Sequence, residues 1–200
     1  YEATRTRNKL TMDLLADVPW LMGFRTQFVN LWIDDGEGAV DQGVFTHIEA
    51  VGNRWLERRG LDRGDNLYKV GRFSFSPDDR EAVAVDDAGT PLDNARFERV
   101  LEIESGSDHR ALTRMLTALH DPSVDFQTVL DRHFNRNNVM AWMVANVLLH
   151  QTDAVSHNLI LHNPKGSERF YFVPWDYDGT FVLEAEPPNA TDQTSLRQRL

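Results

Sequence analysis

Carboxylate and amide side chains gather in two short stretches late in the chain. Asp153 and Asn158 stand five residues apart after an apolar stretch, and Asp176 follows two β-type runs that a turn separates. A β-hairpin brings its two open ends together, so we expect Asn158 and Asp176 to lie close. Carboxylates collected in this way repel one another unless a proton or a cation joins them. Oxygen ligands of this kind suit Mg²⁺, which proteins bind through one or two carboxylates together with substrate phosphates.

The spacing of Asp153 and Asn158 matches part of a phosphoryl-transfer pattern. In protein kinases the loop H-R-D-x-x-x-x-N supplies an Asp that accepts the substrate hydroxyl proton and an Asn that holds a metal ion, and a later Asp holds the Mg²⁺ that bridges the ATP phosphates. Here Gln151 and Thr152 replace His and Arg, and there is no Asp-Phe-Gly. The D-x-x-x-x-N spacing alone is common in proteins. It becomes evidence for a phosphoryl-transfer site because a helix precedes it and a hairpin that ends in Asp follows it.

Each of these residues also has an ordinary structural interpretation. Asp153 could simply end a helix in solvent, Asn158 could cap the hairpin, and Asp178 could bond to the Gly179 turn. A metal-dependent phosphohydrolase that uses the same Asp, Asn and His groups is a further alternative. We favour catalysis or metal binding because Pro-Trp-Asp-Tyr-Asp stands at the far end of the same hairpin.

Three histidines close to this region suggest zinc. His150, His157 and His162 are spaced by seven and then five residues. Those spacings do not place two ligands on one helix face, as an i, i+4 pair would. We therefore interpret them as ordinary core or surface histidines.

The chain around these residues is expected to mix helices with antiparallel strands. Apolar spacing and turn residues predict helices over 4–16 and 53–59, strands over 28–33, 43–49, 159–162 and 169–173, and short strands within 66–105 at NLYKV, RFSF and EAVAV. Asn53 is expected to cap the second helix. This order favours an α+β protein in two lobes over a doubly wound parallel sheet.

Several helices carry an apolar face that should be buried. The first is expected to carry Ala3, Arg7, Leu10 and Leu14 on one face. Three helices after Asp108 are expected from residues at i, i+3, i+4 and i+7 spacing: Leu112, Met115, Leu116 and Leu119, then Phe126, Val129, Leu130, His133 and Phe134, then Met140, Met143, Val144, Val147 and Leu148. The third of these helices leads directly to Asp153.

Composition excludes several classes of protein. The chain of 200 residues carries 21 Lys and Arg against 31 Asp and Glu, a net charge of −10, so it lacks the basic balance of a general nucleic-acid binder. It contains no cysteine, which excludes disulfides, thiolate nucleophiles and Cys-ligated zinc. It has no run of about 20 apolar residues that would span a membrane.

Three stretches resemble the CotH kinase family, atypical kinases named after a bacterial spore coat protein. They are NVMAWMVANVLLHQTDAVSHNLILH (138–162), RFYFVPWDYDGTF (169–181), and FVNLWIDDGEGAVDQGVFTHIE (28–49) continuing to NLYK (66–69). The P-W-D-x-D element is the most specific part. The turn at Asp34, Asp35 and Gly36 departs from the Asn-Gly turn of the family. The resemblance covers roughly 5–181.

The resemblance implies roles for individual residues. Asp153 corresponds to the catalytic Asp, Asn158 to the metal-side Asn, and Asp176 to the metal-binding Asp, with Asp178 beside it. Two further positions are expected at the nucleotide. They are Lys69, from the Leu-Tyr-Lys motif, and Glu49, which follows the Gly-aromatic strand. The implied reaction is ATP-dependent phosphorylation of Ser or Thr in a protein, with Mg²⁺ or Mn²⁺ as the metal.

The resemblance also carries expectations about extent and location. It implies a two-lobed kinase-like domain over 1–181, truncated at both ends, with an N-lobe remnant near 1–70 and a C-lobe near 105–181. Residues 182–200 are expected to be a polar tail or an incomplete C-terminal segment. Strands of the nucleotide loop are expected before Tyr1. The resemblance to the family favours a location in the spore coat, in the cell envelope or outside the cell. The alternative function is a non-catalytic adhesion or scaffold module at a cell or spore surface.

Overall fold

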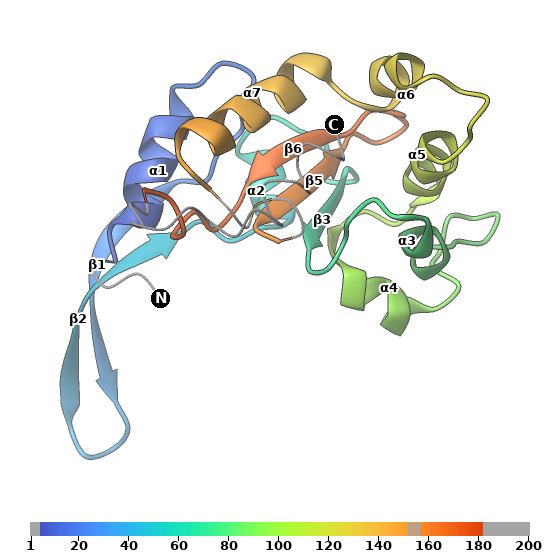
Figure 1. The fold of residues 1–200 in the computed structure, drawn as a ribbon. Coiled ribbons are helices and arrows are strands. Elements are labelled where there is room, and N and C mark those ends of the chain that lie inside the picture. The colour runs from blue at the N-terminus through green and yellow to red at the C-terminus, as the bar shows by residue number, and fades with distance from the viewer. Residues whose placement is uncertain (1–4, 152–153, 155–156, 182–200) are drawn as a thin grey trace.

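The computed structural model describes residues 5–151, 154 and 157–181, and these form helices around antiparallel sheets (Figure 1). The helices are α1 (Arg7–Ala16), α2 (Asn53–Glu57), α3 (Pro77–Ala82), α4 (Asn94–Val100), α5 (Arg110–Leu119), α6 (Phe126–His133) and α7 (Arg136–Leu148). The strands are β1 (Thr26–Asp34), β2 (Ala39–Ile48), β3 (Asn66–Val70), β4 (Leu101–Ser105), β5 (Leu159–Asn163) and β6 (Tyr171–Pro174). The predicted mixture of helices and antiparallel strands is confirmed.

A four-stranded sheet with the order β4-β3-β5-β6 forms the centre of the molecule. All three neighbouring pairs are antiparallel. Every residue of β5 is buried, as expected for a central strand covered on both faces. Helix α7 packs against β6, and helices α3 to α6 lie together at the end of the molecule away from α1 (Figure 1).

The first predicted hairpin is confirmed as β1 and β2, which project from the body as a two-stranded arm (Figure 1). Asp34 begins the turn and its carboxylate accepts the backbone N–H groups of Gly36 and Gly38. A bulge follows Asn30, and Gly43 opposite it has φ +79°, a conformation that glycine adopts without strain. Apolar side chains on the arm are exposed, among them Phe28, Trp32, Ile33, Val40 and Val44.

Two apolar cores lie on opposite faces of the central sheet. The larger contains Tyr68 and Leu161 from the strands, packed against α5, α6 and α7. The smaller joins Leu67, Ile160 and Val173 to α1 and α2. Because successive residues of a strand point to opposite faces, neighbours such as Leu67 and Tyr68 belong to different cores.

The buried faces predicted for the first and last long helices were wrong. In α1, Leu10 is 51% exposed, whereas the buried residues are Asn8, Thr11, Met12 and Leu15. In α7, Val147 is 74% exposed, with Met140, Val144 and Leu148 also exposed; the buried residues are Asn138, Val139, Trp142, Ala145 and Asn146. Both helices bury polar side chains that bond to neighbouring segments, and apolar periodicity does not detect such a face.

The strands expected between residues 72 and 85 were also mostly wrong. RFSF lies outside regular strands, and EAVAV overlaps the end of α3 and continues to Val85, which makes an isolated bridge to Pro91. Helix α3 begins with Ser76 as N-cap, Pro77 at the first position and a capping box to Asp79, all of which are helix-start signals. The N-cap of α2 is Gly52, one residue before the predicted Asn53.

The parts of the chain that the structure describes contain no helix long and apolar enough to cross a membrane. The segment predicted as a polar tail, 182–200, lies outside the described residues.

Candidate active site at the open end of the second hairpin

Strands β5 and β6 form the second predicted hairpin, and its open end brings the two motif stretches together. The pairing runs from His162 with Tyr171 to Leu159 with Pro174. Beyond the last pair, the backbone N–H of Trp175 donates to the carbonyl of Asn158 at 3.2 Å. Asn158 is therefore adjacent to the residue that precedes Asp176, as the hairpin geometry predicts.

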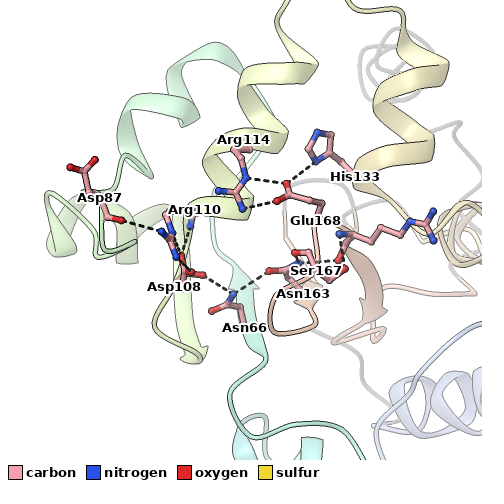
Figure 2. Close-up of polar contacts among 10 residues, drawn as sticks. Asn66, Asp87, Asp108, Arg110, Arg114, His133, Asn163, Ser167 and Glu168 are labelled. Carbon is pink, nitrogen blue, oxygen red and sulfur yellow. Dashed lines mark hydrogen bonds and ion pairs between the residues drawn. The ribbon is translucent and has the colours of Figure 1, made fainter.

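The turn end of this hairpin is anchored to the helices and to β3 (Figure 2). Glu168 pairs with Arg114 of α5 at 2.6 Å, and its carboxylate lies 3.8 Å from Nδ1 of His133 at the end of α6. The side chain of Asn66 donates to Oδ1 of Asn163 at 3.1 Å. These contacts fix the turn, so the hairpin holds its open end in a defined position.

Asp176 is held by side chains from two distant segments. Nδ2 of Asn8 in α1 donates to Oδ1 of Asp176 at 2.9 Å, and Nε2 of Gln151 donates to the Asp176 carbonyl at 3.3 Å. Oδ1 of Asn8 accepts the N–H of Tyr177 at 3.1 Å. Asp176 has φ +52°, a left-handed conformation that is sparsely populated by non-glycine residues and occurs often at functional sites.

The loop after Asp176 is tied to the core. Tyr177 is fully buried, and its hydroxyl donates to Oδ1 of Asn146 in α7 at 2.9 Å. The hydroxyl of Thr180 contacts both the carbonyl of Tyr177, at 2.8 Å, and the hydroxyl of Thr11, at 2.7 Å. Helices α1 and α7 thus fix the loop that carries Asp176.

The predicted catalytic residue, Asp153, lies outside the described residues. The described residues nearest to it on either side, Gln151 and Ala154, are both buried. The backbone N–H of Gln151 donates a hydrogen bond to the carbonyl of Asn146 at 2.9 Å. Asp178 is half-buried in the turn two residues after Asp176.

Lys69 lies near the same end of the sheet. It is on β3 opposite Ile160 of β5. Its Nζ is 3.4 Å from the carboxylate of Glu102 and 5.9 Å from the ring centre of Trp175. Lys69 is thereby close to the residue that precedes Asp176, with a half-exposed ammonium group.

Glu49 occupies a different environment, as the centre of an ion-pair network. Its buried carboxylate accepts Arg58 at 3.0 Å, Arg59 at 2.9 Å and the backbone N–H of Arg25 at 3.3 Å. Burial alone would raise the pKa of Glu49, but the hydrogen bonds from Arg59 and Arg58 outweigh it and hold the pKa below its ordinary value. The contacts of this carboxylate are to arginines, and its predicted place at the nucleotide stays a prediction.

The histidines near the site have separate surroundings. His150 and His157 are exposed, whereas His162 is buried on β5 with its Nε2 2.8 Å from Asp65. Within the described residues, no three His, Asp or Glu side chains are placed so as to hold a metal ion. Asp153 lies outside the described residues, and Asn158 is an amide and not one of these residue types.

Sequence reasoning missed the polar residues that support the loop. Asn8, Asn146 and Gln151 all bond to the segment 176–177. For Asn8 a signal existed, because it shares a helical face with Thr11, Met12 and Leu15 at spacings of three, four and seven. For Asn146 and Gln151 no local pattern distinguishes the side chain from a surface one.

Comparison with known proteins agrees with this arrangement of motifs. A family model described as CotH kinase protein matches residues 1–198. The chain is also similar to a protein named inner spore coat protein H from Bacillus subtilis (strain 168), with 24% identity over 180 residues. That match covers 88% of this chain and 46% of the relative, so the chain spans about half the length of the curated relative it matches.

Proposed function

Because the chain belongs to the CotH kinase protein family, we propose that it is an atypical protein kinase that transfers phosphate from ATP to Ser or Thr hydroxyls of a protein. The observation that carries this proposal is the open end of the β5–β6 hairpin. There Asn158 adjoins Trp175, and the next residue, Asp176, is held by Asn8. Two stretches that carry the family motif thus meet at one place.

The side chains at this place suit a hard cation. The carboxylate of Asp176 and the amide oxygen of Asn158 are the ligand types that Mg²⁺ and Mn²⁺ prefer. When bound there, such an ion would neutralise charge on the ATP phosphates. A buried amide oxygen, Oε1 of Gln151, also lacks a hydrogen-bond partner among the described residues, which adds a polar group beside the loop.

The proposed roles follow from the family motif. Asp153 accepts or orients the proton of the substrate hydroxyl, and Asn158 and Asp176 hold the metal, with Asp178 as a neighbouring carboxylate. Lys69 contributes a positive charge near the nucleotide phosphates. Catalysis in such sites rests mainly on positioning and electrostatic stabilisation, so small displacements of Asp176 should matter.

A second function, a non-catalytic scaffold in a spore coat or cell envelope, is favoured by the name of the relative, which describes a coat protein. The same name supports placing this protein in a spore coat or envelope. The two functions differ in whether the chain binds nucleotide, because a scaffold that has lost the reaction has no need of ATP.

Thermal denaturation with ATP and Mg²⁺ separates them. A ligand that binds only the native state raises the melting temperature by mass action. The kinase proposal expects ATP with Mg²⁺ to stabilise the unchanged protein and Asp153→Ala, but not Asp176→Ala. A scaffold shows no shift in any of the three. Release of free phosphate without a phosphorylated protein product would instead indicate the phosphohydrolase alternative.

A further inference from the structure

We propose that Asn8 is a positioning residue that orients the carboxylate of Asp176 for the metal ion. This inference rests on the proposed function, since it assigns Asp176 to the metal. Asn8 is buried, and it lies 168 residues before Asp176 in the sequence.

The hydrogen bonds of Asn8 can orient the carboxylate of Asp176, which packing alone would not do. Its amide makes two hydrogen bonds to consecutive residues, donating to Oδ1 of Asp176 at 2.9 Å and accepting the N–H of Tyr177 at 3.1 Å. The first bond fixes one carboxylate oxygen and the second fixes the peptide that follows. Together they set both the side chain and the backbone of the proposed ligand.

The backbone conformation of Asp176 explains why the two hydrogen bonds from Asn8, here called the Asn8 clamp, are needed. A non-glycine residue at φ +52° persists only where its surroundings hold it. Gln151 holds the Asp176 carbonyl from the other side of the residue, at 3.3 Å. Without Asn8 the carboxylate would lose its donor from α1, and the loop would be free to relax toward a commoner conformation.

A hydrogen bond that orients a metal ligand has a measurable effect on metal affinity. Loss of such a partner typically lowers metal affinity or activity by about 10- to 100-fold. We therefore expect the Asn8 clamp to act on the metal concentration that the protein requires, with a much smaller effect on turnover once the metal is saturating. A purely structural residue would act mainly on the melting temperature.

Two substitutions separate the parts of the clamp. Asn8→Asp removes the donor to Asp176 but keeps an acceptor for the Tyr177 N–H. Asn8→Ala removes both bonds without adding charge. Thr11→Val is the matched control, since Thr11 lies one helical turn further along α1 and bonds to Thr180 in the same loop without contacting Asp176.

The direct readout is Mn²⁺ binding followed by electron paramagnetic resonance with ATP present, alongside the Mn²⁺ dependence of phosphate transfer. Both Asn8 variants are expected to need about tenfold more Mn²⁺ or higher for half-saturation, while Thr11→Val stays within twofold of the unchanged protein. The inference is overturned if either Asn8 variant binds Mn²⁺ within twofold of the unchanged protein, or more tightly.

The outcomes also separate this inference from the proposed function. Normal Mn²⁺ requirement in the Asn8 variants of an active kinase overturns the inference and leaves the function standing. Mn²⁺ binding that depends on Asn8 and Asp176, without any transfer, overturns the function and supports the inference. Failure of the unchanged protein to bind Mn²⁺ contradicts both.

Discussion

The backbone N–H of Trp175 donates to the carbonyl of Asn158 at 3.2 Å, just past the last paired residues of β5 and β6. This bond closes the open end of the hairpin and makes Asn158 and Asp176 near neighbours. The turn at the opposite end is fixed through Glu168 and Arg114 (Figure 2). The hairpin is thus held at both ends.

Replacing Lys69 should weaken nucleotide binding more than it weakens the fold. Its ion pair with Glu102 is half-exposed, and such pairs contribute only about 0–1 kcal/mol to stability. We expect Lys69→Ala to raise the ATP concentration for half-maximal transfer by about tenfold, the loss of one charge-assisted contact of about 1.4 kcal/mol.

Glu102→Gln provides the control for Lys69. It removes the partner and leaves the lysine, so its ATP requirement should stay within about twofold of the unchanged protein. Equal ATP requirements in Lys69→Ala and the unchanged protein would show that Lys69 is only an ion-paired surface residue.

Glu49→Ala should destabilise the fold. Removing one partner of a buried ion pair leaves the arginines without their carboxylate and costs about 3–5 kcal/mol. We expect the lower end of this range because Arg58 is half-exposed. The free energy of unfolding in urea measures this. Glu57→Ala, which removes an exposed pair with Arg63, should cost less than about 1 kcal/mol.

The same pair of variants tests the role predicted for Glu49 from the family motif. If Glu49→Ala keeps its stability and loses ATP binding, the carboxylate serves the nucleotide. If it loses stability to the same degree with and without ATP, its function is to hold Arg58 and Arg59.

The hydroxyl of Tyr177 should contribute measurably to stability. Tyr177→Phe leaves Oδ1 of Asn146 buried without its donor, which costs about 1–3 kcal/mol. The matched control is Tyr171→Phe, because Tyr171 is half-buried on β6; we expect a change within about 0.5 kcal/mol there. Equal melting temperatures for the two variants would contradict the importance of this bond for the loop.

Stability should fall as the pH drops below neutral. Burial lowers the pKa of His109, His133 and His162 below their ordinary value of 6.5. Below pH 6.5 the unfolded chain therefore binds protons that the folded chain does not. The free energy of unfolding then decreases with falling pH, by up to about 1.4 kcal/mol per pH unit for each histidine.

Urea unfolding between pH 7.5 and 5.5 measures this slope. His109→Gln is the control. It should reduce the slope of the free energy of unfolding against pH by about the contribution of one histidine, whatever its effect on the stability at a single pH. A free energy of unfolding that is constant or rises as the pH drops across this range would contradict the prediction.

The fold around the site could be predicted from the sequence wherever a local pattern matched the final structure. Alternating residues and turn chemistry identified both hairpins, and the second of them brings Asn158 to Trp175. Apolar spacing correctly identified α5, whose buried residues include Leu112 and Met115. In α5 the buried face is also the apolar face.

Prediction failed where a helix buries polar groups. Helix α1 presents Asn8 and Thr11 to the loop after Asp176, so Leu10 and Leu14 are left exposed. Helix α7 buries Asn138, whose side chain bonds to the backbone of Phe172 in β6. These helix faces are buried because their polar side chains bond to residues more than 30 positions away along the chain. The apolar periodicity of the helix therefore does not predict them.

We propose that Asp153 serves phosphate transfer and does not serve nucleotide binding. The most direct test is transfer of labelled phosphate from ATP to protein by Asp153→Ala, at saturating Mg²⁺ and ATP. We predict a fall of about 100-fold or more, the usual contribution of a positioned general base, with ATP and Mg²⁺ still raising the melting temperature. Transfer by Asp153→Ala at the rate of the unchanged protein would contradict the account.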